Sequence, residues 1–142
     1  MDTGIGLPNA VPDTPAPVIT EWARRAEQGG FSTLGTIGRL VAGAAVDQAW
    51  QDAGREGRPR KLSLAYFALG PDARQAADTY LKRYYAFTGP VADQIAAGAA
   101  VSPDQVRGAA SAFEQAGCDE LIFVPCSSNP DQVGLLAEVL HG

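Results

Sequence analysis

Apolar residues gather in short runs separated by longer amphipathic stretches, a spacing typical of alternating strands and helices. The runs that predict strands are Gly4–Leu7, Ser32–Ile37, Leu62–Leu69 and Glu120–Val124. None of them alternates cleanly between polar and apolar positions, which is the pattern of parallel strands covered on both faces. The sequence therefore predicts a predominantly parallel α/β sheet.

Helix starts between these runs are marked by a side-chain oxygen followed by proline, a pair that caps a helix and fills its first position. The pairs are Thr14-Pro15, Ser102-Pro103 and Asn129-Pro130. Gln105 and Gln132 stand three residues after the second and third caps, where a capping box needs them. These signals predict helices that begin at or just after each proline.

Apolar side chains recur at helical spacing after each of these starts, so each helix has one apolar face. The stripes are Val18, Trp22 and Ala26; Val106, Ala110 and Phe113; and Val133, Leu136, Ala137 and Leu140. Further helices are expected at 42–53, 72–87 and 91–97. We expect Trp22 and Trp50 in the core or in an interface.

Right-handed crossovers place the four expected strands side by side in chain order, within one domain that spans residues 1–142. Four parallel strands in chain order are half of a βα barrel, so the expected architecture is a four-stranded parallel half-barrel of the TIM type. The length of 142 residues, far fewer than the ~250 of a complete barrel, agrees with this. We expect a homodimer that completes eight strands, in which the first strand of each copy pairs with the last strand of the other. An open sheet with helices on both faces is the alternative, and it needs no partner.

The chain is acidic, with a net charge of −5 and an isoelectric point near 4.7. This balance argues against nucleic-acid binding, which depends on clustered positive charge. The short basic run of Arg55, Arg58, Arg60 and Lys61 is interpreted as a solvated loop, with a phosphate contact as the alternative. There is no long apolar run, and no basic leader follows Met1, so we expect a cytoplasmic protein without membrane contacts.

Two segments of the chain are similar to a known family. Residues 4–41 (GIGLPNAVPDTPAPVITEWARRAEQGGFSTLGTIGRLV) resemble the opening strand, helix and second strand of luciferase-like monooxygenases. Residues 49–140 resemble the closing stretch of that family, notably in GREGRPRKLSLAYFALGPDA and SAFEQAGCDELIFVPCSSNPDQVGLLAEVL. The family consists of flavin- or deazaflavin-dependent oxidoreductases on a (β/α)8 barrel, so about four central βα units are absent here.

The resemblance implies oxidoreductase or monooxygenase chemistry on a small organic substrate, with FMN or coenzyme F420 bound weakly or lost. Family members often carry an acidic residue where this chain has Gly38. A cofactor-independent cyclase, lyase or isomerase, working by positioning in the remodelled cavity, is one alternative. A non-catalytic partner subunit is another.

The carboxyl ends of the strands supply the candidate site residues, because the working groups of βα barrels lie there. We expect Asn9, Arg39, Tyr66 and Ser127 to border one common cavity. The candidate catalytic residues are Arg39, Tyr66 and Cys126, and the candidate cofactor-binding residues are Asn9, Thr36, Ser127, Ser128 and Asn129.

The segment 126–129 is the strongest candidate, because it joins a strand end to a helix start, where free N–H groups favour a phosphate or carboxylate. Capping of the helix by Ser128 or Asn129 is the alternative. Cys126 is a candidate nucleophile, but no histidine lies near it in sequence to activate it, and the alternative is a small buried hydrophobic residue.

The other candidates also have two interpretations each. Arg39 either contacts an anionic ligand or forms a surface ion pair. Tyr66 lines a pocket or is an ordinary core aromatic. The single histidine, His141, argues against a metal site made of several histidines and against a histidine-based triad. Cys118 is separated from Cys126 by an extended segment of more than about 20 Å, so the two are not expected to form a disulfide.

Overall fold

The structure is a computed structural model that describes residues 4–6, 15–29, 33–37 and 43–142. The chain forms two compact units, Met1–Leu64 with Ala112–Ile122 and Ala65–Ser111 with Phe123–Gly142. Strands β3 (Lys61–Phe67) and β4 (Glu120–Pro125) each begin in the first unit and end in the second. No helix among the described residues is long and apolar enough to span a membrane.

The first unit is built on parallel strand pairs. β1 (Gly4–Gly6) pairs with β2 (Thr33–Ile37) in the register Gly4↔Thr33, and β2 pairs with β3 in the register Leu34↔Lys61. The strands stand in the order β1-β2-β3-β4, which is their order in the chain. The α/β class with parallel pairing is therefore confirmed, whereas the half-barrel and its completion by a second copy stay predictions.

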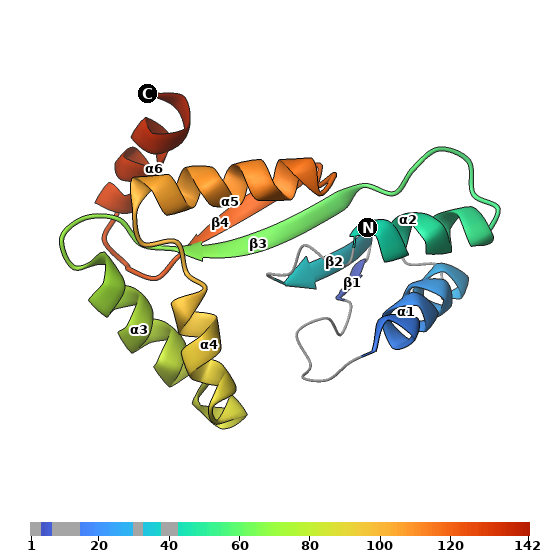
Figure 1. The fold of residues 1–142 in the computed structure, drawn as a ribbon, viewed down its shortest axis with the longest axis horizontal. Helices are drawn as coiled ribbons and strands as arrows, with labels where there is room; N and C mark the ends of the chain where they lie inside the picture. The colour runs from blue at the N-terminus through green and yellow to red at the C-terminus, as the bar shows by residue number, and fades with distance from the viewer. Residues whose placement is uncertain (1–3, 7–14, 30–32, 38–42) are drawn as a thin grey trace. The chain divides into compact units, whose positions relative to one another are not determined.

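Helices α1 (Ala16–Gln28) and α2 (Gly43–Asp52) lie side by side in the first unit (Figure 1). They pack through small side chains. Ala23 of α1 is buried against Val46 and Ala49 of α2. Ala26 is buried as expected, but Trp22 keeps 42% of its surface exposed and Val18 is exposed beside it. Val18 and Trp22 are therefore not part of the core of this unit, and the other expectation for Trp22, an interface, stays a prediction.

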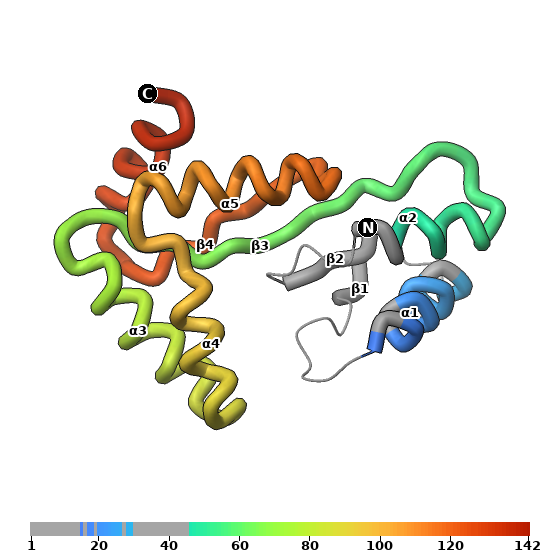
Figure 2. Tube along the Cα trace, viewed as in Figure 1, coloured from blue at the N-terminus to red at the C-terminus, as the bar shows by residue number. Residues whose placement is uncertain are grey.

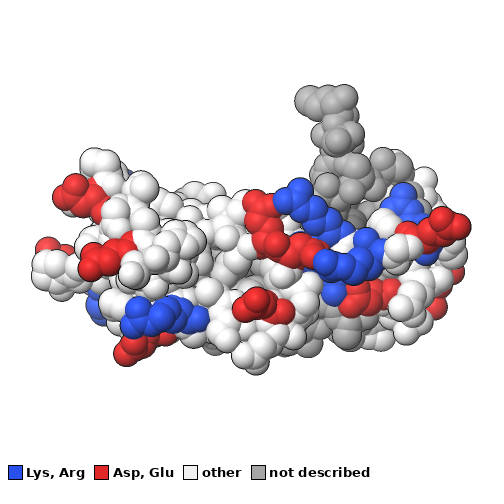
Figure 3. All heavy atoms as spheres, turned by 90° about the horizontal axis from the view of Figure 1, so that it is seen from above, with Lys and Arg blue, Asp and Glu red and all other residues white. Residues whose placement is uncertain are grey.

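Charged side chains tie the starts of β3 and β4 together in the first unit. The Lys61 N–H donates to Asp119 Oδ2 at 2.8 Å, and Arg58 pairs with the same carboxylate. Arg60 pairs with Glu120, while Lys61 Nζ lies 2.6 Å from Asp47. Arg58 and Arg60 of the basic run expected as a solvated loop are thus exposed but paired with acidic groups. Figure 3 shows positive and negative side chains interspersed on one face of the molecule.

The second unit places helices on both faces of the ends of β3 and β4 (Figures 1 and 2). Its helices are α3 (Ala73–Tyr84), the 3-10 turn η2 (Ala86–Thr88), α4 (Val91–Ala97), the start of α5 (Pro103–Gln115) and α6 (Asp131–His141). Tyr66 packs on a cluster that includes residues of α3 and α4. Phe67, the next residue, packs on a second cluster with Val106 of α5 and residues of α6. Successive strand residues point to opposite faces, so each face has its own small core.

Strands and helices lie within a few residues of their expected ranges, with two informative differences. The helix expected over 72–87 ends at Tyr84 and continues as η2. A variant of the capping box exists at Ser102: the Gln105 N–H donates to Ser102 Oγ at 3.3 Å, and Gln105 Oε1 accepts at 2.8 Å from the N–H of Val101, one residue before the cap. It does not exist at the start of α6, because the Gln132 side chain bonds to Leu69 instead. Thr14 lies outside the described residues.

Candidate functional site

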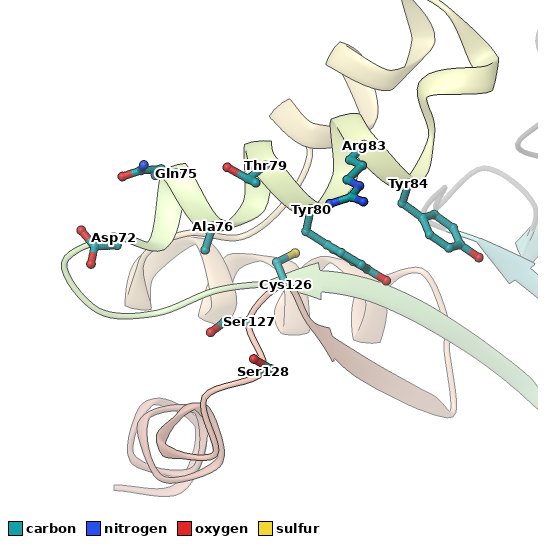
Figure 4. Close-up of a pocket in the computed structure, with 10 residues that line it drawn as sticks. All are labelled: Asp72, Gln75, Ala76, Thr79, Tyr80, Arg83, Tyr84, Cys126, Ser127 and Ser128. Atoms are coloured by element: carbon teal, nitrogen blue, oxygen red, sulfur yellow. The ribbon is translucent and has the colours of Figure 1, made fainter.

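A cleft of about 960 Å³ opens in the second unit, between α3 and the segment that follows β4 (Figure 4). One wall is formed by α3 side chains that recur at helical spacing and so share one face of the helix. The other wall is formed by Cys126, directly after the end of β4, and by the hydroxyls of Ser127 and Ser128. The cleft therefore lies at the carboxyl end of β4, the place where βα barrels carry their working residues. The lining residues are Asp72, Gln75, Ala76, Thr79, Tyr80, Arg83, Tyr84, Cys126, Ser127 and Ser128.

Cys126 is fixed at the floor of this cleft. Its N–H donates to the Phe67 carbonyl at 2.8 Å, and the residue is only 7% exposed within the cluster that also holds Ala77 and Leu81. Burial raises the pKa of the Cys126 thiol to about 11, because the thiolate would lose its hydration. A thiol that stays protonated at neutral pH is a poor nucleophile. This geometry agrees with the interpretation of Cys126 as a small buried hydrophobic residue.

Side chains of the segment after Cys126 accept hydrogen bonds from backbone N–H groups at and before the start of α6. The Asp131 N–H donates to Asn129 Oδ1 at 3.0 Å, and the Asn129 N–H donates to Ser127 Oγ at 3.2 Å. Asn129 thus acts as a cap, as the alternative interpretation proposed. Ser127 and Ser128 line the cleft, whereas Asn129 does not. An anion bound here would therefore be held by the two serine hydroxyls and not by N–H groups of the helix start.

Tyr66 lies beneath the cleft and not in its lining. Its hydroxyl is 2.8 Å from that of Tyr85, and its ring makes edge contacts with Tyr80 and Tyr85 at centroid distances of 6.3 and 6.2 Å. Burial, with the Tyr85 hydrogen bond as a second cause, raises the pKa of Tyr66 above its ordinary value. Tyr66 therefore supports the aromatic residues that line the cleft.

The remaining candidates are Asn9, Thr36 and Arg39. Asn9 and Arg39 lie outside the described residues. Thr36 is in β2, where it pairs in register with Ser63. The expectation that Asn9, Arg39, Tyr66 and Ser127 border one cavity therefore stays a prediction.

Helix α3 supplies most of the lining, and sequence reasoning missed it. The candidate site residues expected from the sequence include none of its lining side chains, among them Tyr80, Arg83 and Tyr84. A signal was present, because residues 72, 75, 76, 79, 80, 83 and 84 recur three or four positions apart and so share one face of a helix. That face is polar and aromatic, which is the composition of a wall exposed to solvent or ligand.

Charge is distributed unevenly along the cleft. Asp72 and Gln75 stand at one end, and Arg83 stands with Tyr84 at the other (Figure 4). No carboxylate pairs with Arg83 in the part of the chain that the structure describes, whereas Arg74 pairs with Asp78 at 2.7 Å and Lys82 with Asp93 at 3.1 Å. The Arg83 end of the cleft is therefore suited to an anion.

Comparison with known proteins supports a relation in fold only. No protein-family model matches the chain, and neither does any curated protein sequence. A solved structure of an F420-dependent secondary alcohol dehydrogenase in complex with an F420-acetone adduct is similar, with a TM-score of 0.66 at 13% identity. The match covers 96% of this chain and 46% of that chain, so this chain spans less than half the length of the enzyme. The likeness supports the luciferase-like resemblance at the level of the fold.

Proposed function

We propose that the chain is a luciferase-like oxidoreductase that acts on a small organic substrate and binds coenzyme F420 or FMN weakly in the cleft of the second unit. The observation that carries this proposal is the fold shared with an F420-dependent dehydrogenase. The cleft at the carboxyl end of β4 adds a place for the ligand, where enzymes of the barrel type act.

The residues present fit the cofactor class. Both cofactors have a planar ring system and a phosphate group, and the cleft offers aromatic rings, an arginine and hydroxyls. Its volume of about 960 Å³ falls in the range of ligand pockets, roughly 300–1,000 Å³. When bound, such a cofactor would supply hydride transfer. The chain would bind the phosphate through Arg83 or Ser127 and Ser128, and would orient the ring against Tyr80 and Tyr84.

Weak cofactor binding is expected because the chain is shorter than the dehydrogenase that it resembles in fold. The match covers 46% of the dehydrogenase, so fewer residues are present to contact a cofactor of the same size. The entropy lost on capture of the ligand does not shrink in proportion. Loss of the central βα units of a barrel would account for this length, and a second copy of the chain would restore part of the missing wall.

Equilibrium titration of F420 and of FMN tests the binding claim. We expect weak binding of at least one cofactor, and weaker binding to Ser127→Ala than to Ser102→Ala, a serine that caps α5 and does not line the cleft. Tight binding that is insensitive to Ser127→Ala would show that the Ser127 hydroxyl does not hold the anion. Failure of both cofactors to bind would favour the cofactor-independent enzyme or the partner subunit.

A turnover assay tests the reaction class separately. With F420 present, small secondary alcohols and other small organic substrates should cause loss of the visible absorbance of oxidised F420 as hydride is transferred. Binding without any change of absorbance across the panel would keep the ligand site but overturn the oxidoreductase proposal.

A further inference from the structure

Two exposed tyrosines form a fixed aromatic surface at one end of the cleft. Tyr80 and Tyr84 are 37% and 59% exposed, and their rings stack with centroids 5.8 Å apart and an interplanar angle of 30°. Tyr84 also meets the edge of Tyr85 at 4.9 Å. Tyr85 is anchored in turn through its hydroxyl, which lies 2.8 Å from that of Tyr66. The exposed rings are therefore held in place before any ligand arrives, which lowers the entropy lost on binding.

Arg83 adds a positive charge to this surface. It lies between Tyr80 and Tyr84 in the lining, and Figure 4 shows it at the same end of the cleft as both rings. Its neighbours Arg74 and Lys82 are paired with carboxylates, but no carboxylate pairs with Arg83 among the described residues. A guanidinium left without an acidic partner beside exposed rings is an arrangement suited to a ligand anion.

The acidic residue of the cleft does not neutralise this end. Asp72 precedes α3 and is eleven positions from Arg83, a helical rise of about 16 Å. Ser127 and Ser128 stand on the opposite wall and present hydroxyls only. The cleft therefore has a basic aromatic end and an acidic end. A ligand with one anionic group is oriented with that group towards the basic end.

We propose that the Tyr80–Arg83–Tyr84 surface of α3 recognises a planar aromatic ring that carries a carboxylate or phosphate. The ring stacks on the tyrosines and the anion pairs with Arg83. This inference rests on the proposed function for the position of the ligand, since FMN and F420 belong to this chemical class, but it also includes an aromatic acid bound as substrate.

FMN and riboflavin provide the test of the anion, because they share one ring system and only FMN has the phosphate. We expect wild type to bind FMN about tenfold to a hundredfold more tightly than riboflavin, the range for a hydrogen bond to a charged group. Arg83→Gln should remove this preference and leave riboflavin affinity unchanged. The matched control Lys82→Gln, one position along the same helix, should keep the preference.

Substitution of the ring surface separates stacking from charge. Tyr84→Leu should weaken FMN and riboflavin by the same factor, since both use the ring. The side chains of Arg83 and Tyr84 are exposed, so Arg83→Gln and Tyr84→Leu should match wild type in far-UV circular dichroism and in the unfolding midpoint. If FMN binds but neither Arg83→Gln nor Tyr84→Leu changes its affinity, the α3 surface is not the recognition element, although the proposed function stands.

Naphthoate, titrated as a planar aromatic carboxylate, distinguishes substrate from cofactor. If naphthoate binds with dependence on Arg83 while FMN and F420 do not bind, the inference holds and the cofactor proposal fails. If FMN, riboflavin, F420 and naphthoate all fail to bind, both are overturned.

Discussion

The side-chain amide of Gln132 joins the start of α6 to the end of β3. Its Oε1 accepts from the Leu69 N–H and its Nε2 donates to the Leu69 carbonyl, both at 2.8 Å, and the residue is only 6% exposed. The amide thus replaces the backbone pairing that Leu69 would have in a longer strand. Because Ser127 and Ser128 lie between β4 and α6, this contact also helps to place the hydroxyl wall of the cleft.

Replacing Gln132 tests this contact. Gln132→Ala leaves a buried N–H and a buried carbonyl without partners, so we expect a loss of about 2–3 kcal/mol in the free energy of unfolding. Urea denaturation measures it. The control is Gln105→Ala at the exposed capping box of α5, which should cost about 1 kcal/mol or less. Equal costs for the two variants would contradict the buried role of Gln132.

The Cys126 thiol makes the free energy of unfolding depend on pH in the alkaline range. Folding raises its pKa from the ordinary value of 9.0 to about 11, so the folded state favours the protonated form. The associated stability is complete below pH 9 and is lost as the pH rises towards 11. Urea denaturation across this range should show a steeper loss in wild type than in Cys126→Ala. Identical pH slopes would show that the thiol is not protected in the fold.

At the scale of elements, α3 and α4 approach closely because their contact is made of small side chains. Ala77 of α3 and Ala96 of α4 are fully buried in one cluster with Leu81. The Arg74 guanidinium, which also pairs with Asp78, reaches the Ala96 carbonyl at 2.5 Å. This packing holds the α3 wall of the cleft in place.

Enlarging one of these alanines should disturb the wall. Ala96→Leu forces a larger side chain into a filled contact, and we expect it to cost about 1–3 kcal/mol in the free energy of unfolding. Ala97→Leu, at the next and exposed position of α4, should cost less than about 0.5 kcal/mol. Thermal or urea denaturation of the pair measures the difference. No difference would mean that α3 and α4 do not pack as closely as described.

Local patterns predicted most elements because each carried its own signal. Strand β4 is an apolar run, and α5 begins at a reciprocal cap between Ser102 and Gln105. The same pattern failed at Gln132, because Leu69, which follows β3 and lies 63 positions earlier in the chain, offers its side chain a better partner. Apolar spacing could not decide between core and interface for Trp22, because it does not reveal which neighbours cover a helix face.

The candidate site was only partly predictable for a related reason. The working groups of βα barrels lie at the carboxyl ends of the strands, and this rule identified Ser127 and Ser128, which come directly after the end of β4. It could not identify Arg83 or Tyr84, because α3 faces this segment only after the chain folds back over the sheet. A polar and aromatic stripe is also what an ordinary solvated helix face looks like.

At the scale of the whole molecule, we propose a homodimer. β1 and β4 stand at the two ends of the strand order. The first unit exposes Trp22 on α1, and the second unit has an apolar groove of about 480 Å³ along α6 in which Val133 is exposed. Exposed apolar surfaces of this kind on a small chain indicate association, and a second copy is the partner that the strand order favours.

Light scattering at micromolar concentration tests the dimer. We expect twice the mass of the chain for wild type, and a shift towards monomer for Val133→Glu, which places a charge in the α6 groove. Phe87→Glu, a substitution at another exposed apolar residue that is not part of the groove, should stay dimeric. A stable wild-type monomer would favour the open sheet that needs no partner.

The central claim is that the cleft between α3 and the end of β4 binds the cofactor. Chemical-shift mapping of the isotope-labelled protein during a titration with F420 tests it most directly, because it locates a weakly bound ligand. We predict that the backbone signals of Thr79, Arg83, Ser127 and Ser128 shift together along one saturating curve. Shifts confined to α1 and α2, or no shifts at high F420 concentration, would contradict the account.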